Sequence, residues 1–226
     1  MLKFGMRALG LLILALWLVA CGKTTVAPKK VTAQSFQEGK EYQVIASSNI
    51  TPLVGPKKTV EVQEFFSYDC PACYHFEADL KIWCDKKPDY VRFERIPVIF
   101  QASWEGVARA YYIASMLGVE QQLTPAIFKA IHVDRENLSD PDEQKDFFVK
   151  HGISQQAYES MANFSPGIDA QLLRSNTLMQ QYQITSAPTL VVDSRYKVDP
   201  SLVSGDPERF LQVVDYLIEK VRKGEP

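Results

Sequence analysis

A predicted β-strand runs directly into a predicted helix between residues 60 and 84, and a Cys-Pro-Ala-Cys motif stands at the junction. The strand, Val60–Phe66, places alternate side chains on opposite faces. Glu64 is the single acid on the face that it shares with Val60, Val62 and Phe66. This segment constrains the chain more than any other, because a strand pattern, a helix pattern and two cysteines meet in it.

The two cysteines of the motif are predicted to have different surroundings. Cys70 falls at the N-cap of the helix and Pro71 at its first position, which proline favours. Free backbone N–H groups and the positive end of the helix dipole favour an anion there, so the Cys70 thiol is expected to be exposed and to ionise readily. Cys73 begins an apolar helical stripe that ends at Cys84, and its thiol is expected to be shielded. The pattern predicts dithiol–disulfide exchange.

Two segments far apart in the chain carry a family resemblance. EFFSYDCPACYHFEADL resembles the active site of the DsbA family of periplasmic thiol:disulfide oxidoreductases. TSAPTLVV is similar to the cis-proline loop of that family, with Pro188 in the proline position, and the similarity runs from about Glu41 to the C-terminus. The resemblance implies an α/β protein with a thioredoxin fold and an inserted all-helical subdomain. It also implies that Pro188 faces a redox pair of Cys70 and Cys73; the alternative is a proline that only starts a strand.

Three further residues are expected to contact substrate. Pro71 and Ala72 lie between the cysteines, and Ala187 precedes the proline. Many family members have His at the position of Ala72 and Val or Thr at that of Ala187, so this chain departs from the pattern twice. Asp69 places a negative charge beside Cys70 and should oppose ionisation of its thiol. We therefore expect a milder oxidant than the strongest members of the family.

An acid and a base on neighbouring strands form a second candidate pair. Arg95 interrupts an apolar face of the strand predicted over Tyr90–Ile99, as Glu64 does on its own strand. The family has a buried acid and a basic residue, commonly Lys, beneath its cysteines, and the resemblance implies that Glu64 and Arg95 handle protons for the dithiol. A lone buried charge is costly without a partner or a purpose. The alternatives are an ordinary ion pair or two unrelated surface charges.

The N-terminus, MLKFGMRALGLLILALWLVAC, has a basic start and an apolar run from Ala8 to Ala20. The run is short for a membrane-spanning helix, so residues 1–20 are predicted to be a signal peptide. Leu-Val-Ala-Cys at its end resembles the lipobox of bacterial lipoproteins, which predicts a lipidated Cys21 and a flexible tether over residues 21–40. A plain secretory signal or an uncleaved anchor is the alternative. The lipoprotein interpretation places the chain in the periplasm, on an inner or an outer membrane.

Cys84 is expected to be a buried, inert thiol. It follows Cys73 by three helical turns, so the two lie ~16 Å apart on a straight helix, whereas a disulfide needs Cα atoms within roughly 7 Å. A zinc site of Cys70, Cys73, His75 and Cys84 is conceivable, but one helix directs His75 away from Cys73 and no second CxxC completes the site. No metal and no cofactor is therefore predicted. Three histidines are expected to be solvated helix residues: His75, His132 and His151.

The resemblance and the capping signals together divide the chain. Residues 41–103 are predicted to form the first half of the thioredoxin domain, 104–182 the helical insertion and 183–226 the second half. A first strand is expected near Tyr42–Ala46, a loop over Asn49–Lys58 and a hairpin that joins Thr189–Val192 to Tyr196–Val198. Helix starts are predicted at Thr124-Pro125, Asp140-Pro141, Ser154 and Asp206-Pro207, and helix ends at Gly118 and Gly152.

The amino-acid composition alone does not indicate an activity, so the prediction of function rests on the motifs. The formal net charge is −2 and no basic stripe is present, which argues against nucleic-acid binding. The resemblance implies a thiol:disulfide oxidoreductase that introduces disulfide bonds into reduced exported proteins and is reoxidised by a membrane oxidase like DsbB. The alternatives are a disulfide isomerase or reductase of the same superfamily, and a redox-inactive binding or chaperone module.

Overall fold

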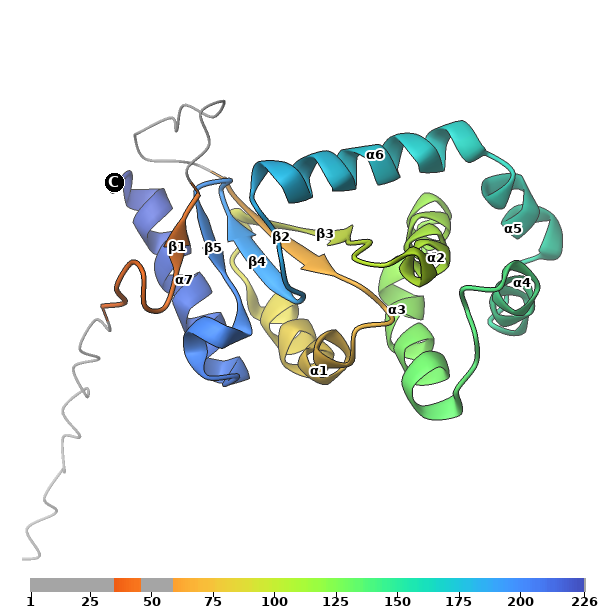
Figure 1. The fold of residues 1–226 in the computed structure, drawn as a ribbon, viewed down its shortest axis with the longest axis horizontal. Helices are drawn as coiled ribbons and strands as arrows, with labels where there is room; N and C mark the ends of the chain where they lie inside the picture. Colours follow the sequence, from red (N-terminus) through yellow and green to blue (C-terminus); the bar gives the residue numbers. More distant parts are fainter. Residues whose placement is uncertain (1–34, 46–58, 226) are drawn as a thin grey trace, which may run out of the picture. The chain divides into compact units, whose positions relative to one another are not determined.

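The computed structural model describes residues 35–45 and 59–225. The predicted signal peptide, Cys21, most of the predicted tether and the loop predicted over Asn49–Lys58 lie outside the described residues. A mixed sheet of five strands forms the centre of the described chain, in the order β1-β5-β4-β2-β3 (Figure 1). The strands are β1 (Gln43–Val44), β2 (Val60–Phe66), β3 (Val91–Pro97), β4 (Thr189–Val192) and β5 (Tyr196–Val198).

The sheet register brings the predicted acid and base together. Strand β2 is parallel to β3 and antiparallel to β4, and Glu64 is directly opposite Arg95. Strands β4 and β5 form the predicted hairpin, whereas β1 is shorter than predicted and pairs only with β5. A parallel pair needs a crossover connection, and the helix that follows the cysteine motif makes it.

Helices α1 (Pro71–Lys86) and α7 (Pro207–Lys223) cover one face of the sheet (Figure 1). Their apolar side chains share a core with alternate residues of β2 and β4. Asp206 caps α7 through its carboxylate, as predicted, and accepts hydrogen bonds from the N–H groups of Glu208 and Arg209. Intermediate residues of the same strands, including Phe65 and Val191, pack on the other face against the end of α6.

The helical insertion lies between β3 and β4 and confirms the predicted fold class. A 3-10 turn, η1 (Ala102–Trp104), leads into it, and another, η3 (Pro200–Val203), precedes α7. The insertion contains α2 (Glu105–Met116), α3 (Glu120–Lys129), the single π-helical turn η2 (Ala130–Asp134), α4 (Pro141–Lys150), α5 (Gln155–Ala162) and α6 (Ser165–Gln181). Asp140 and Ser154 cap α4 and α5 as predicted, and Gly118 and Gly152 follow the ends of α2 and α4 with positive φ.

One predicted helix start is wrong. Helix α3 begins at Glu120, and Thr124-Pro125 lies inside it. The Thr124 hydroxyl donates to the Glu120 carbonyl at 2.7 Å instead of accepting from the N–H groups of a new helix. Helix α3 thus starts just after the turn at Gly118, and Pro125 lies past its first turn, where it has no N–H to donate within the helix.

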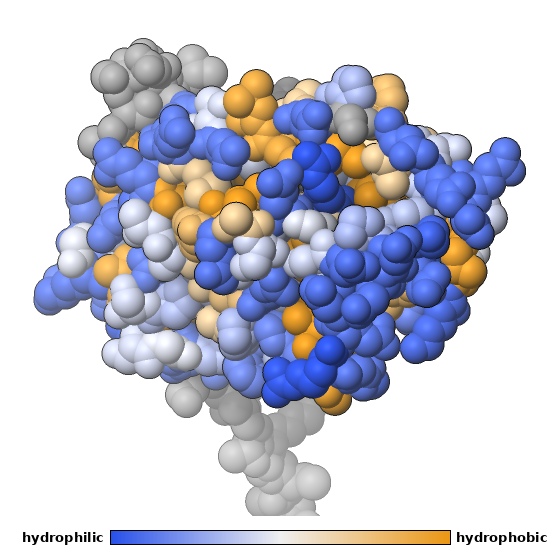
Figure 2. All heavy atoms as spheres, turned by 45° about the vertical axis from the view of Figure 1, so that its right-hand side comes forward, coloured by the Kyte–Doolittle hydropathy of each residue, from blue (hydrophilic) through white to orange (hydrophobic). Residues whose placement is uncertain are grey.

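The surface of the insertion is mixed in polarity. Figure 2 shows polar residues over most of this face with smaller apolar areas between them. Several large apolar side chains of the insertion are exposed: Val133, Val149, Phe164 and Leu173. Within the described residues, no helix combines the length and the apolar character that crossing a membrane requires.

Candidate active site around Cys70 and Cys73

The two cysteines lie at the start of α1, at the helix positions that the sequence predicts. Cys70 is the N-cap with an extended backbone, and Pro71 occupies the first helical turn. The Cys70 sulfur lies 3.4 Å from the backbone nitrogen of Cys73, which donates a hydrogen bond to it. The N–H groups at a helix N-terminus have no acceptors within the helix. Here one of them donates to the Cys70 sulfur, where it stabilises the thiolate form.

The surroundings of the two thiols shift their pKa values in opposite directions. A hydrogen bond from the Cys73 thiol lowers the pKa of Cys70 to about 7, and the backbone N–H groups of Cys73 and Ala72 act in the same direction against the effect of burial. Burial raises the pKa of Cys73, and the neighbouring Cys70 raises it further. Cys70 is thus the thiol that ionises near neutral pH, and Cys73 stays protonated.

Cys70 is less exposed than the sequence suggests. Only 6% of Cys70 and 1% of Cys73 are exposed, and both belong to a core that includes residues of the insertion. The prediction of an exposed sulfur was wrong because the side chain turns back over the helix start. It lies 3.4 Å from the carbonyl oxygen of Ala187, in the loop before β4. The Ala187–Pro188 peptide bond is cis, and Pro188 is buried.

A pocket beside the motif contains two of the three predicted substrate-contacting residues. Ala72 and Ala187 line this pocket of about 460 Å³. The rest of the lining is mostly polar: Gln43, Gln183, Ile184, Thr185, Ser186, Thr189, Lys197, Asp199, Pro200 and Ser201. Pro71, the third residue, is exposed at the start of α1. A polypeptide that reaches the cysteines from this side would meet small side chains next to Cys70 and hydrogen-bonding groups further along.

Glu64 and Arg95 form an ion pair behind the cysteines. Nε of Arg95 donates to Oε2 of Glu64 at 2.8 Å, and only 2% of the Glu64 side chain is exposed. Burial raises the pKa of Glu64, and Arg95 opposes that rise. The negative charge of Glu64 in turn raises the pKa of both Cys70 and Cys73, so the pair and the dithiol interact electrostatically.

The structure adds Glu77, which sequence reasoning missed. Arg95 also donates to Oε2 of Glu77 at 2.6 Å, so one guanidinium bridges two carboxylates. Burial raises the pKa of Glu77 to about 7, with Arg95 acting against the rise and Glu64 adding to it. Glu77 follows Cys73 by four residues, and that spacing places both on one side of α1. The spacing was therefore a signal, but it did not show that Arg95 reaches across to the helix.

The structure corrects the predictions for Cys84 and for two of the three histidines. Cys84 is a free thiol but only half-buried, because Trp83 takes the buried position on α1; burial raises its pKa to about 12. His75 is exposed as predicted, whereas His132 and His151 are half-buried. Each of the latter two places a ring nitrogen 2.7 Å from a backbone carbonyl oxygen, of Tyr68 and Phe147 respectively.

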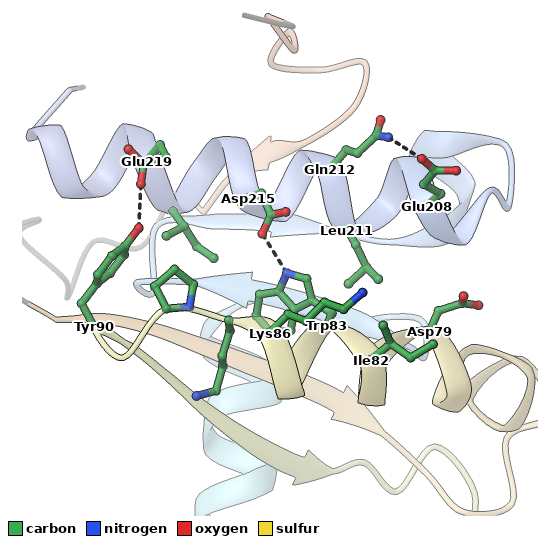
Figure 3. Close-up of a pocket in the computed structure, with 13 residues that line it drawn as sticks. Asp79, Ile82, Trp83, Lys86, Tyr90, Glu208, Leu211, Gln212, Asp215 and Glu219 are labelled. Carbon is green, nitrogen blue, oxygen red and sulfur yellow. Dashed lines mark hydrogen bonds between the residues drawn. The ribbon is translucent and has the colours of Figure 1, made fainter. Parts of the chain in front are cut away.

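A pocket of about 640 Å³ between α1 and α7 lies away from the cysteine motif (Figure 3). Two hydrogen bonds join the elements around it. The Trp83 indole donates to Asp215 at 2.7 Å, and the Tyr90 hydroxyl donates to Glu219 at 2.8 Å. Figure 3 shows both bonds reaching from α1 and the start of β3 to α7. These contacts fix α7 against α1, and neither Cys70 nor Cys73 lines the pocket.

Comparisons with known proteins identify the family of this chain. The family model described as a DSBA-like thioredoxin domain matches residues 61–213. The thiol:disulfide interchange protein DsbA of Pseudomonas aeruginosa is 36% identical over 190 residues, which cover 84% of this chain and 88% of that protein. The protein of the same name from Burkholderia cepacia is 34% identical over 184 residues, covering 81% and 85%.

Solved structures resemble the fold over the same range. The crystal structure of P. aeruginosa DsbA superposes with a TM-score of 0.75 at 36% identity and covers 83% of this chain and 95% of that one. The oxidoreductase DsbA of Xylella fastidiosa gives a TM-score of 0.71 at 30% identity, covering 82% and 97%.

Proposed function

The chain belongs to the DSBA-like thioredoxin domain family, and we propose that it introduces disulfide bonds into exported proteins with Cys70 and Cys73 as its redox pair. It is a thiol:disulfide oxidoreductase; its relatives at 34–36% identity are named thiol:disulfide interchange protein DsbA. One observation carries the assignment of the pair. The Cys70 sulfur accepts the N–H of Cys73 at the start of α1, with a pKa of about 7, while the Cys73 thiol stays protonated.

The oxidised protein carries a Cys70–Cys73 disulfide in this mechanism. A substrate thiolate attacks the Cys70 sulfur, the Cys70–Cys73 bond breaks, and Cys73 leaves with the electron pair and takes up a proton. A second substrate thiolate then attacks the substrate sulfur of the mixed disulfide and releases Cys70 as a thiolate. The substrate loses two electrons and the two thiol protons, and the protein disulfide gains the electrons. A sulfur with a lowered pKa is the better leaving group in the second step.

Glu64, Arg95 and Glu77 are assigned to proton handling for this cycle. Cys73 has a raised pKa, so it must receive a proton when the disulfide opens and lose it when the disulfide re-forms. Glu64 interacts with both thiols, and Arg95 connects Glu64 to Glu77, whose pKa of about 7 suits proton exchange near neutral pH. Support for this assignment comes from the electrostatic effect of buried Glu64 on both thiols, which the ion pair with Arg95 alone would not require.

Substrate is assigned to the side of Cys70 that faces Pro188. The carbonyl oxygen of Ala187 lies 3.4 Å from the sulfur, so a peptide bound there would be held close to the reacting bond. Ala72, Ala187 and Pro71 are then the nearest side chains to the substrate. All three are small or exposed, which leaves room for a polypeptide rather than for one fixed side chain.

Lipidation of Cys21 would hold this activity at a membrane. The support for it is the sequence Leu-Val-Ala-Cys directly after the apolar run of residues 8–20. The exported substrates imply a periplasmic location, because disulfides persist in oxidising compartments. A DsbB-like membrane oxidase is the proposed electron acceptor that returns Cys70 and Cys73 to the disulfide. The inner and the outer membrane are both compatible with Gly22 after the cysteine.

Oxidation of a reduced two-cysteine peptide in glutathione buffer tests the proposed function. We expect the oxidised protein to accelerate peptide disulfide formation, and Cys70→Ser to abolish the acceleration. Cys84→Ala is the matched control and should keep the rate, because Cys84 lies three turns along α1 from the reacting pair. Acceleration that survives in Cys70→Ser, or none in the unaltered protein, would contradict the assignment.

Refolding of a substrate with scrambled disulfides separates the oxidase from the isomerase and reductase alternatives. An oxidase restores activity slowly from the scrambled form and quickly from the reduced form. The reverse order of rates would assign the chain to isomerisation, with the same pair of cysteines.

A further inference from the structure

The helical insertion holds the turn that presents Cys70 at two points. The Tyr68 hydroxyl lies 2.8 Å from the hydroxyl of Thr124 in α3, and both residues are about 1% exposed. The Tyr68 carbonyl oxygen lies 2.7 Å from Nε2 of His132 in η2. The turn itself closes with the N–H of Cys70 donating to the Ser67 carbonyl at 3.1 Å. Tyr68 is therefore fixed at its side chain and at its backbone, two residues before the reacting sulfur.

The His132 ring is oriented on both sides. A carbonyl oxygen only accepts hydrogen bonds, so Nε2 of His132 carries a hydrogen. The ring stacks on Tyr74 with centroids 4.8 Å apart and planes 11° apart, and Phe128 lies at 6.1 Å. Tyr74 follows Cys73 directly in α1. The imidazole thus lies between the turn before Cys70 and the helix that begins with it.

His132 also acts on the charge next to Cys70. Asp69 is half-buried; burial raises its pKa, and His132 opposes that rise. A carboxylate beside a thiol disfavours the thiolate, and a cation close to the carboxylate offsets the effect. The motif itself offers no imidazole, because Ala72 stands between the cysteines.

We propose that His132 is a positioning residue for Cys70, which fixes the turn through the Tyr68 carbonyl and opposes the effect of Asp69 on the Cys70 thiol. This inference rests on the proposed role of Cys70 as the reacting thiol. It makes the helical insertion part of the reacting site, and it predicts that the thiolate fraction of Cys70 depends on a residue more than sixty positions away in the sequence.

Other ionisable groups around His132 are few. On the turn and on α1 these are Asp69, Tyr74 and the exposed His75. On α3 and η2, Lys129 and Asp134 form an ion pair with Nζ 2.7 Å from Oδ1, and Arg135 follows η2 on the surface. Lys129 and Asp134 pair with one another, so Asp69 is the carboxylate on which His132 acts.

Titration of the Cys70 thiolate by its ultraviolet absorbance tests the inference in the reduced full chain. His132→Gln retains an N–H donor but cannot become a cation, and His132→Phe retains a ring for Tyr74 but loses both. We expect the thiolate fraction below pH 7 to fall about two- to fivefold in His132→Gln and further in His132→Phe. His151→Gln is the matched control, since His151 is also half-buried and bonded to a carbonyl, and it should leave the fraction unchanged.

Repeating the titration in an Asp69→Asn background tests whether His132 acts on the Cys70 thiol through the Asp69 carboxylate. If His132 acts through Asp69, His132→Gln should change the thiolate fraction less in Asp69→Asn than in the unaltered chain. Thermal melting confirms that each variant is folded, and His132→Gln keeps the test available should His132→Phe fail to fold. An unchanged thiolate fraction in folded His132→Gln, or an equal loss in His151→Gln, overturns the inference. Cys70→Ser must abolish the signal; if it does not, the proposed function fails instead.

Discussion

The Cys70 sulfur lies 3.4 Å from the carbonyl oxygen of Ala187, a residue 117 positions further along the chain. The contact joins the start of α1 to the loop before β4, so the two halves of the thioredoxin fold meet at the sulfur that we propose to react. A substrate that approaches from this side must replace the contact with one of its own.

Enlarging Ala187 should therefore slow reaction with polypeptides. Ala187→Val adds two methyl groups to the wall that Ala187 shares with Ala72, and a β-branched residue suits the extended backbone before proline. We expect kcat/KM for a reduced peptide to fall about tenfold, with a smaller change for glutathione, which needs less room. Stopped-flow oxidation of both substrates measures the ratio. Equal losses for peptide and glutathione would show that residue 187 does not select by size.

Arg95 should matter for stability because it pairs with the buried carboxylate of Glu64 and the half-buried carboxylate of Glu77. Arg95→Met leaves Glu64 and Glu77 without their shared cation, and we expect the free energy of unfolding to fall by about 3–5 kcal/mol. Arg92→Met on the same strand is the control, since Arg92 is exposed, and it should change stability by less than about 0.5 kcal/mol. Urea denaturation of the reduced proteins gives both values. A loss for Arg95→Met no greater than for Arg92→Met contradicts the buried network.

The low pKa of Cys70 predicts a pH dependence of stability in the reduced protein. The folded pKa is about 7 against an ordinary value of 9.0, so between these values the unfolded chain binds more protons. Stability from this group should therefore rise as pH increases from 7 to 9, and should be lost as pH falls through 7. A shift of this size corresponds to about 2–3 kcal/mol at pH 9.

Comparison with Cys70→Ala isolates that contribution. The difference in unfolding free energy between the reduced unaltered chain and Cys70→Ala should grow over the interval from pH 7 to pH 9. Groups remote from Cys70 titrate alike in both proteins and cancel in the difference. Burial keeps the pKa of Cys73 well above 9, so Cys73 loses its proton only above this interval. A difference that stays constant across this interval would mean that folding does not lower the Cys70 pKa.

Cys21 gives the test of membrane attachment. Cells that express the full chain and are fed a labelled fatty acid should incorporate label into the protein, and Cys21→Ser should remove it together with the membrane-bound fraction. Cys84→Ser should retain both, because that cysteine lies on α1. An unaltered chain that takes up no label would contradict lipidation of Cys21 and favour the plain signal or the uncleaved anchor.

Local signals in the sequence predicted the centre of this site well. Proline at the first helical position fixes where α1 begins, and the alternation along β2 places Glu64 on the face beneath the helix. Arg95 could be paired with Glu64 because both strands show the same pattern of one charge on an apolar face. These features depend on neighbours within a few residues, which a sequence displays directly.

Contacts made by the insertion could not be predicted in this way. The pattern around His132 is that of an ordinary helix, and its bond to Tyr68 depends on how α3 and η2 pack against the turn. Thr124 resembles a helix cap in sequence, but its hydroxyl bonds to Glu120 and Tyr68 instead. Cys84 has the spacing of a buried position, yet Trp83 packs into the core in its place. Each error concerns a tertiary contact that competes with a local preference.

Trapping the mixed disulfide tests the central claim most directly. In the reduced Cys73→Ala variant, the Cys70 thiolate should attack a peptide whose cysteine carries a disulfide-linked leaving group. The mixed disulfide with the peptide should then persist, because the residue that would displace the peptide from Cys70 is absent. Mass spectrometry of the digested adduct should find the peptide on Cys70, at one equivalent per chain. A peptide found on Cys84, or no adduct under conditions that label a free thiol, would contradict the assignment of Cys70 as the reacting sulfur.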